Sequence, residues 1–183
     1  MFLGYSDLTT IINAIYTKTG KSSVLYQVRH LVNDNGAVQM KRFKNSVLDG
    51  KDDLYQIEYG FIQGNEMKGI TVGGNIRCLL KLVGTEYFPD MEGKILVLDA
   101  RSGKLLQVVM YLSQLKQLGT LEKVSGILLG TFIELERNPA MPHIKDNIHE
   151  FTGKELPIAY TKEIGHGTDA KAIVIGKEIW LRG

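Results

Sequence analysis

The turn Gly4-Tyr5-Ser6-Asp7 is the first place in this sequence where the residue types could do chemistry. It follows a short apolar run and precedes a helical pattern, so the serine would present its hydroxyl at a strand-to-helix turn. The amide of Asp7 would then point from the start of the helix toward an oxyanion that develops on a bound carbonyl. Serine and aspartate are also common helix caps. From the tetrapeptide alone, capping is the more frequent role, and a nucleophilic Ser6 is the alternative.

A nucleophilic serine needs a base, and the base needs an acid that orients it. Among the histidines His166 stands out, because the glycines on both sides of it permit a tight turn. Asp99 is the candidate acid, since it directly follows the apolar run 94–98. A solvated loop histidine and a carboxylate that caps a turn are the alternatives. We expect the other histidines at the surface, in polar segments: His30, His143 and His149.

Other patterns indicate structure rather than chemistry. The segment Gly73-Gly74-Asn75 lacks the spacing of a phosphate-binding loop, and we interpret it as a tight turn whose asparagine caps a helix. The single cysteine, Cys78, lies in an apolar run and is expected to be a small buried side chain. No group of His, Cys and carboxylate residues has metal-ligand spacing. Neither a metal nor another cofactor is predicted.

Apolar periodicity indicates the elements that must position these residues. Helices are predicted over 8–18, where Gly20 ends the helix, and over 76–83 and 105–118. Short apolar runs bounded by turn residues predict strands at 94–98, 125–131, 156–160, 172–175 and 179–181. We therefore predict a mixed α/β domain over residues 70–183.

The first 69 residues are predicted to form two parts. Residues 1–30 hold a strand, the serine turn and a helix, whereas 31–69 are interpreted as a linker with strand character, including an exposed strand at 54–59. A strand with one helix cannot bury its faces and belongs to a larger parallel sheet. No further βα pattern follows soon enough, so we expect a segment before Met1 to supply that sheet.

Composition narrows the function classes. Hydrophobic residues make up 44% and charged residues 23% of the 183-residue chain, which is typical of a soluble globular protein. The net charge is +2, and no basic tract stands out beyond 41–44, so neither nucleic acid nor a membrane is expected as a partner. The sequence has no signal-peptide pattern and no membrane-spanning stretch. One cysteine excludes a disulfide framework, and we expect a cytoplasmic protein.

Several stretches follow one another in a specific order: 4–9, 73–75 with 79–80, 84–90, 93–99, 112–116, 126–132 and 165–167. Each is weak alone. As an ordered set, from residue 2 to the C-terminus, they resemble the serine LD-carboxypeptidases, the family of the muramoyltetrapeptide carboxypeptidases and the microcin C immunity peptidases. The fold class implied is α/β. It consists of the C-terminal LD-carboxypeptidase domain, preceded by a strand–turn–helix remnant of a Rossmann-like or flavodoxin-like N-terminal domain.

The resemblance implies a Ser-Glu-His triad divided between the two domains. Ser6 corresponds to the nucleophile and His166 to the base, the acid position falls on Asp99, and the Asp7 amide is an oxyanion donor. The implied reaction is hydrolysis of the L,D-amide of a murein tetrapeptide, which releases the terminal D-amino acid during peptidoglycan recycling. We also expect a homodimer.

The chain departs from the family pattern at the site. Asp99 stands where the family has glutamate, and its side chain is one methylene shorter; a displacement of about 1 Å can cost on the order of 100-fold in rate. A second oxyanion donor, in a Gly-Gly segment of the family's N-terminal domain, would precede Met1. The family's His-Gly-Pro segment is also absent from 24–30, and His30 is given no role.

Loss of one oxyanion donor typically costs about 100- to 1000-fold, so we expect slow or no turnover by this chain alone. Two other functions stay open. One is a non-catalytic C-terminal fragment or association module, and the other is an immunity-type hydrolase of aminoacyl-nucleotide analogues.

Overall fold

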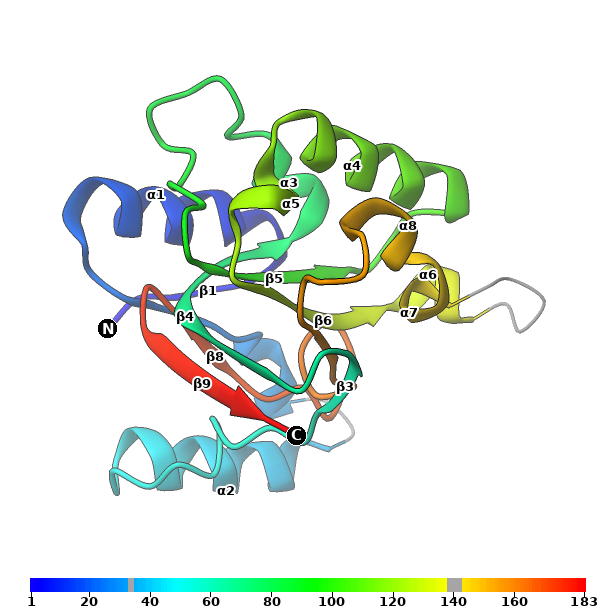
Figure 1. The fold of residues 1–183 in the computed structure, drawn as a ribbon. Coiled ribbons are helices and arrows are strands. Elements are labelled where there is room, and N and C mark those ends of the chain that lie inside the picture. The colour runs from blue at the N-terminus through cyan, green and yellow to red at the C-terminus, as the bar shows by residue number, and fades with distance from the viewer. Residues whose placement is uncertain (33–34, 138–142) are drawn as a thin grey trace.

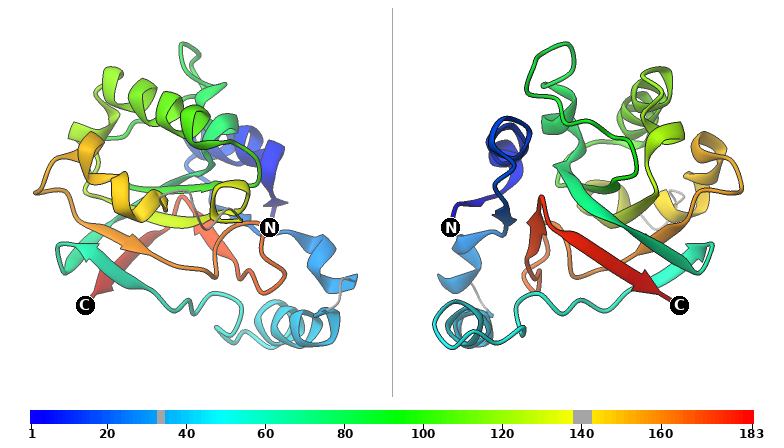
Figure 2. Two further views of the ribbon diagram at one scale, coloured as in Figure 1. Left: turned by 90° about the vertical axis from the view of Figure 1, so that its right-hand side faces the viewer. Right: turned by 60° about the vertical axis from the view of Figure 1, so that its left-hand side comes forward.

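The computed structural model describes residues 1–32, 35–137 and 143–183. These residues form a mixed α/β fold with a three-stranded sheet, β1-β2-β8, and a six-stranded sheet, β3-β7-β6-β5-β4-β9. Helices α3 and α4 lie over one face of the larger sheet, and α2 lies at the opposite side of the molecule (Figures 1 and 2). The α/β fold class predicted from the sequence is confirmed.

The strands are β1 (Leu3–Gly4), β2 (Ser23–Leu25), β3 (Gly60–Gln63), β4 (Glu66–Asn75), β5 (Ile95–Ala100), β6 (Gly126–Phe132), β7 (Ile158–Tyr160), β8 (Ile173–Ile175) and β9 (Glu178–Arg182). The α-helices are α1 (Thr9–Thr19), α2 (Gly36–Val47), α3 (Ile76–Leu80), α4 (Leu105–Gln117), α5 (Thr120–Lys123), α6 (Ile133–Glu136), α7 (Ile144–Asn147) and α8 (His149–Thr152). Two 3₁₀ turns are η1 (Ser6–Leu8) and η2 (Val28–Val32).

The larger sheet is buried on both faces at its centre. Strands β4, β5, β6 and β7 pair in parallel, and the antiparallel strands β3 and β9 form its edges. Alternate residues of β5 enter different cores: Leu96 and Leu98 pack in the core that includes α4, whereas Ile95 and Val97 pack with Ile12 of α1. This two-residue period explains why β5 reads as a continuous apolar run.

Most predicted elements are present close to their predicted bounds. Helix α1 ends at Gly20, which is left-handed with φ 66°. The Asn75 side chain accepts a hydrogen bond from the Cys78 amide and caps α3, as predicted, although α3 ends at Leu80 rather than at residue 83. Helix α4 and strands β5 to β9 also lie where apolar periodicity placed them.

Three local predictions were wrong. Gly73 and Gly74 are not a turn but lie inside β4. The segment 54–59 is not a strand, because the Tyr55 amide closes a turn onto the Asp52 carbonyl and the buried Leu54 anchors that turn. Residues 36–47 form helix α2 where strand character was expected. The residues that α2 buries are Gly36 and Gln39, neither of them a large apolar side chain, so the helix leaves little apolar pattern.

The strand with the serine turn finds sheet neighbours within the chain, contrary to expectation. Strand β1 pairs in parallel with β2, which follows α1 directly, and β2 pairs antiparallel with β8 near the C-terminus. The unit β1-α1-β2 is therefore the βα repeat that apolar pattern did not indicate, since β2 has only three residues. The division of the chain at residues 30 and 69 stays a prediction.

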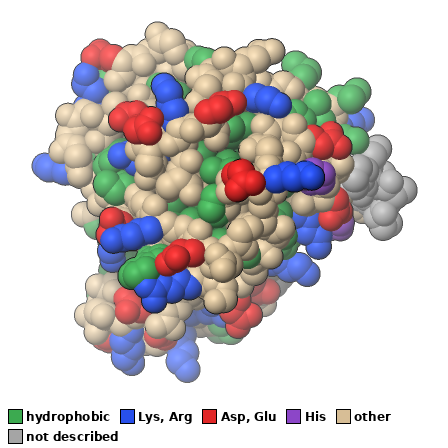
Figure 3. Space-filling model, viewed as in Figure 1, with side chains coloured by type: hydrophobic (Ala, Val, Ile, Leu, Met, Phe, Trp, Pro, Cys, Tyr) green, Lys and Arg blue, Asp and Glu red, His purple; other side chains and the backbone are tan. Residues whose placement is uncertain are grey.

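The surface carries mixed charge. On the face shown in Figure 3, acidic and basic side chains are interspersed rather than gathered in a patch of one sign. Within the described ranges, no helix is both long and apolar enough to cross a bilayer.

Candidate active site

The backbone at Ser6 has a conformation that serine rarely adopts. Its φ is 51°, and it is the one non-glycine residue with positive φ in the described part of the chain. A Cβ at Gly4 would lie 2.7 Å from Ile12 Cγ2, so this glycine lets β1 pass close beneath α1. The cap positions of η1 and α1 fall on Tyr5 and Leu8, and neither makes a side-chain cap hydrogen bond. A strained serine at a close strand-to-helix turn is the geometry of a nucleophile elbow.

The helix that follows Ser6 docks onto the end of β4 through two polar side chains. The Asn13 amide group donates to the Gly73 carbonyl and accepts from the Gly73 amide, each at 2.8 Å. One turn earlier, Thr9 Oγ1 accepts from the Asn75 amide at 3.1 Å. A Cβ at Gly74 would lie 2.8 Å from Thr9 Oγ1, so a glycine there permits the approach. These contacts fix the serine turn relative to the large sheet.

Asp99 and His166 form a close buried pair. Asp99 Oδ2 lies 2.8 Å from His166 Nδ1, and the two side chains are only 1% and 6% exposed. The distance is that of a hydrogen bond, but the ring N–H is not aligned with the carboxylate oxygen. The two groups therefore lie at ion-pair distance without a well-formed hydrogen bond. A carboxylate at Nδ1 favours a proton on that nitrogen and leaves Nε2 as the basic atom.

Two glycines bring the His166 loop against β6. A Cβ at Gly130 would lie 2.5 Å from the Ile164 carbonyl oxygen, and one at Gly165 would lie 2.2 Å from Thr131 Oγ1. The Thr131 hydroxyl accepts from the His166 amide at 3.2 Å. The close approach predicted for the glycine before His166 is therefore present and fixes the backbone that carries the imidazole.

Tyr5 connects the serine turn to this pair. Its ring lies 4.6 Å, centroid to centroid, from the His166 imidazole, at an interplanar angle of 57°. Burial raises the pKa of its hydroxyl, the charge of Asp99 raises it further, and Arg101 partly opposes both. The phenol is thus neutral and close to the carboxylate. Since Ser6 follows Tyr5, the serine turn and the imidazole belong to one cluster.

The third contact of a triad is not formed in this structure. His166 Nε2 is buried and has no hydrogen-bond partner among the described residues, Ser6 included. Catalytic hydrogen bonds are commonly long or misaligned without substrate and tighten when it binds. The Asp99–His166 pair is assembled, whereas a Ser6–His166 hydrogen bond is not formed.

The expectation for His30 was wrong. It is 1% exposed, with the Tyr26 ring edge-on at 6.3 Å. Burial lowers the pKa of His30, and the positive charges that His166 and Arg29 can carry lower it further. His30 lies in the 3₁₀ turn η2, and nothing in the sequence marked it as buried. The other two, His143 and His149, are exposed as predicted.

A charged cluster borders the serine turn on the outside. The exposed Asp7 carboxylate lies 3.3 Å from Arg77 and 3.6 Å from Lys81, and it accepts from the Cys78 thiol at 3.2 Å. The thiol hydrogen bond and then the Lys81 charge lower the pKa of Asp7. Cys78 is buried as predicted, and burial raises the pKa of its thiol. The cluster ties η1 to α3.

Ser6, Asp99 and His166 lie apart from a mainly apolar cavity of the fold. A pocket of about 730 Å³ is lined by β8, β9 and the segment 52–57, and Ser6, Asp99 and His166 do not border it. It is mainly apolar and contains no catalytic constellation, so the buried pair rather than the cavity identifies the candidate site. Within the described residues, no cluster of three His, Cys or acidic side chains could hold a metal.

The LD-carboxypeptidase C-terminal domain matches residues 68–181, which is more than half of the chain. A putative carboxypeptidase from Synechocystis is 27% identical over 99% of this chain and 60% of its own length. A probable murein peptide carboxypeptidase from Bacillus subtilis is 26% identical over 96% of this chain and 58% of its own. The chain thus spans about three fifths of the length of these relatives.

Solved structures share the fold. The microcin C7 self-immunity protein MccF, in complex with aspartyl sulfamoyl adenosine, superposes with a TM-score of 0.82 at 19% identity, over 98% of this chain and 64% of that one. The muramoyltetrapeptide carboxypeptidase from Oxalobacter formigenes gives a TM-score of 0.79 at 20% identity, over 100% of this chain and 65% of that one. The order of motifs, the domain match and the shared fold agree, and this chain belongs to the LD-carboxypeptidase family.

Proposed function

We propose that Ser6, His166 and Asp99 form a serine carboxypeptidase site that hydrolyses the L,D-amide of a murein tetrapeptide. The observation that carries the proposal is the buried Asp99–His166 pair, with Nδ1 and Oδ2 at 2.8 Å, beside a strained serine turn. The names of relatives that act on murein peptides support the substrate class. The cytoplasm as location and a homodimer as assembly stay predictions from the sequence.

Each residue has a role that its position supports. Ser6 Oγ attacks the amide carbonyl and passes its proton to His166 Nε2, while Asp99 holds the opposite ring nitrogen. The oxygen of the tetrahedral intermediate accepts from the Asp7 amide, in the first turn after the strand, where amides lack intrahelical partners. The protonated imidazole then gives its proton to the leaving D-amino acid, and His166 activates a water to release the acyl group.

The expected rate is low for two physical reasons. The aspartate side chain is shorter than the family's glutamate, and an apo contact that is close but misaligned is consistent with that difference. The 183 residues assayed by themselves would supply one oxyanion donor, the Asp7 amide, and a site with one donor fewer is typically slower by about 100- to 1000-fold. An immunity-type hydrolase of aminoacyl-nucleotide analogues is the second candidate, because the fold is shared with the MccF complex of aspartyl sulfamoyl adenosine.

The test measures release of a terminal D-amino acid from a murein tetrapeptide, and in parallel hydrolysis of an aminoacyl sulfamoyl adenosine. It uses the 183-residue chain with and without an N-terminal domain taken from a relative. We expect slow hydrolysis of the peptide, more with the added domain, and complete loss in Ser6→Ala. Ser22→Ala is the control, since that exposed serine bonds only the Gly176 carbonyl.

Each result decides between the candidates. Hydrolysis of the adenosine analogue but not of the peptide would identify the site as that of an immunity-type hydrolase. If neither substrate turns over even with the added domain, the chain is a non-catalytic module and the enzyme proposal fails. Fast turnover by the chain alone would contradict the argument about the second oxyanion donor.

A further inference from the structure

His166 lies in a loop, residues 162–171, whose base closes through its own residues. The Lys171 amide donates to the Glu163 carbonyl at 2.6 Å, and the two side chains form an ion pair at 2.9 Å. The Glu163 amide is in turn bonded to Thr161 Oγ1 at 3.0 Å. These contacts fix the two ends of the loop. They do not reach its tip, residues 168–170, which follows the imidazole.

The tip is held by a buried side chain of helix α2. Gln39 Nε2 donates to the carbonyl oxygens of Thr168, at 2.9 Å, and Ala170, at 3.1 Å. Its Oε1 accepts from the Tyr26 hydroxyl at 3.3 Å. Gln39 is 0% exposed. The bonds to Tyr26 and Ala170 are buried and the bond to Thr168 is part-buried, and two of the three go to the loop that carries His166.

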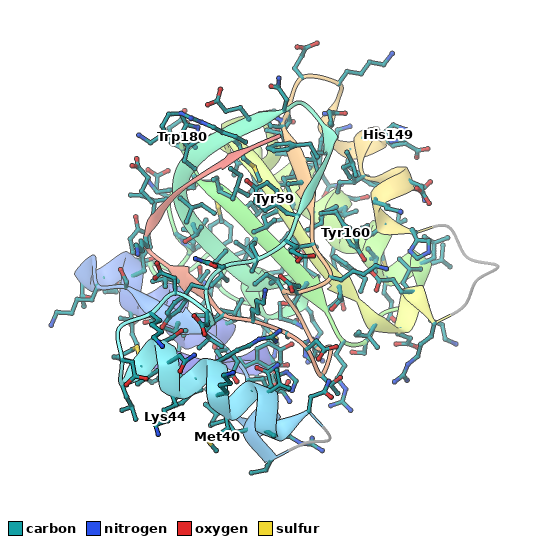
Figure 4. The ribbon with its side chains drawn as sticks, turned by 90° about the horizontal axis from the view of Figure 1, so that it is seen from below. Met40, Lys44, Tyr59, His149, Tyr160 and Trp180 are labelled. Carbon is teal, nitrogen blue, oxygen red and sulfur yellow. The ribbon has the colours of Figure 1, made fainter. Side chains whose placement is uncertain are left out.

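A second contact from the start of α2 reaches the same tip. Asn35 Nδ2 donates to Asp169 Oδ1 at 2.5 Å and approaches Thr168 Oγ1 at 3.4 Å. The outward side of the helix faces solvent, as Met40 and Lys44 show at the lower edge of Figure 4. The half-buried Phe43 of α2 packs against the Tyr26 ring, and the polar contacts of Asn35 and Gln39 join the start of the helix to the loop.

We infer that Gln39 is a positioning residue of this site: from helix α2 it holds the tip of the 162–171 loop and thereby places His166 between Asp99 and Tyr5. Gly165 and Thr131 hold the loop on the side that precedes the imidazole, and Gln39 holds the side that follows it. Without the amide, the buried Ala170 carbonyl oxygen and the part-buried Thr168 carbonyl oxygen lose their donor, and the tip must move toward water to satisfy them. The inference rests on the proposed function only in that His166 is the base.

The test compares the full chain with Gln39→Met, which keeps the volume and removes the hydrogen bonds. The position of His166 is read by NMR from the ring-current shift that the nearby Tyr5 ring imposes on the imidazole protons. We expect those protons to shift in Gln39→Met, and amides 164–170 to exchange about tenfold faster, with β5 unchanged. Asn35→Ala should act in the same direction more weakly. Asn45→Ala is the control, since this α2 side chain bonds Asp53 instead.

Activity gives a second, separable reading. If the chain turns over peptide, Gln39→Met should lower kcat by about 10- to 100-fold with KM little changed, because a displaced base affects the chemical step. Imidazole signals and loop exchange that match those of Asn45→Ala would overturn the inference, whether or not the chain is active. If Gln39→Met unfolds, Asn35→Ala decides by the same two measurements. If the wild type stays inactive even with the added N-terminal domain while the His166 signals shift in Gln39→Met, the proposed function is refuted and the positioning role stays intact.

Discussion

Replacing Asn13 with alanine should detach the nucleophile helix from the large sheet. Strand β9 pairs with β4 only as far as Ile70, so the next residues of β4 have no strand on that side. The Asn13 side chain takes that place at Gly73, and Thr9 takes it at Asn75. Residues four apart on a helix lie on one face, and here they satisfy backbone groups two residues apart on a strand.

The magnitude follows from the groups that lose their partners. Asn13 is 0% exposed, and it satisfies both the amide and the carbonyl of Gly73. A buried polar group left unsatisfied costs about 1–3 kcal/mol. Two such groups predict that Asn13→Ala lowers the free energy of unfolding by about 3 kcal/mol. That is a large share of the roughly 5–15 kcal/mol that stabilises a typical domain.

Urea denaturation gives the free energy, and native-state hydrogen exchange locates the loss. In the wild type, amides of α1 should be protected nearly as well as those of β5, because α1 is pinned by these bonds. In Asn13→Ala the protection of α1 should fall first. Thr10→Ala is the matched control, since its hydroxyl bonds only the Asp7 carbonyl of the same turn. A loss below about 1 kcal/mol, or one no larger than in Thr10→Ala, would refute the reasoning.

The remaining predictions concern the His166 loop and its buried neighbour. Gly165→Ala should lower the free energy of unfolding, measured by urea denaturation, by more than about 2 kcal/mol, because φ is +123° and a Cβ would lie 2.2 Å from Thr131 Oγ1. At Gly167 a Cβ would meet no atom within 4 Å, so Gly167→Ala should change this free energy by less than about 0.5 kcal/mol. In the folded protein the pKa of His30 is lowered from 6.5, so near this pH the unfolded chain binds more protons than the folded one. The free energy of unfolding therefore falls as pH drops below about 6.5, by at most about 1.4 kcal/mol per pH unit. His30→Gln should flatten that dependence between pH 7.5 and 5, and an equal slope in both proteins would contradict this assignment.

Sequence alone determined the parts of this protein that rest on local pattern. Apolar runs with a two-residue or helical period fixed α1, α4 and the central strands, because burial of a strand or helix face requires that period whatever lies opposite. Motif order pointed to Ser6, Asp99 and His166, and the structure brings Asp99 and His166 to 2.8 Å. The glycine before His166 also gave a correct signal, since a close backbone approach requires it.

Only the tertiary structure showed the parts of the fold that polar side chains, rather than a periodic apolar face, hold in place. Helix α2 was missed because the residues that it buries fully are Gly36 and Gln39, while its Phe43 ring is only partly buried, so no clear hydrophobic face marks it. His30 was misplaced because its burial depends on tertiary contacts, which the local sequence of η2 does not show. In the sheet β1-β2-β8, strand β8 lies about 150 residues after β2 in the sequence. Each pair of neighbouring strands is joined by three paired residues or fewer, and strands this short show no alternation of apolar and polar residues that could be detected. Such hydrogen-bond partners cannot be found from the spacing of residues in the sequence, since any polar side chain that is long enough to reach the acceptor can make the bond.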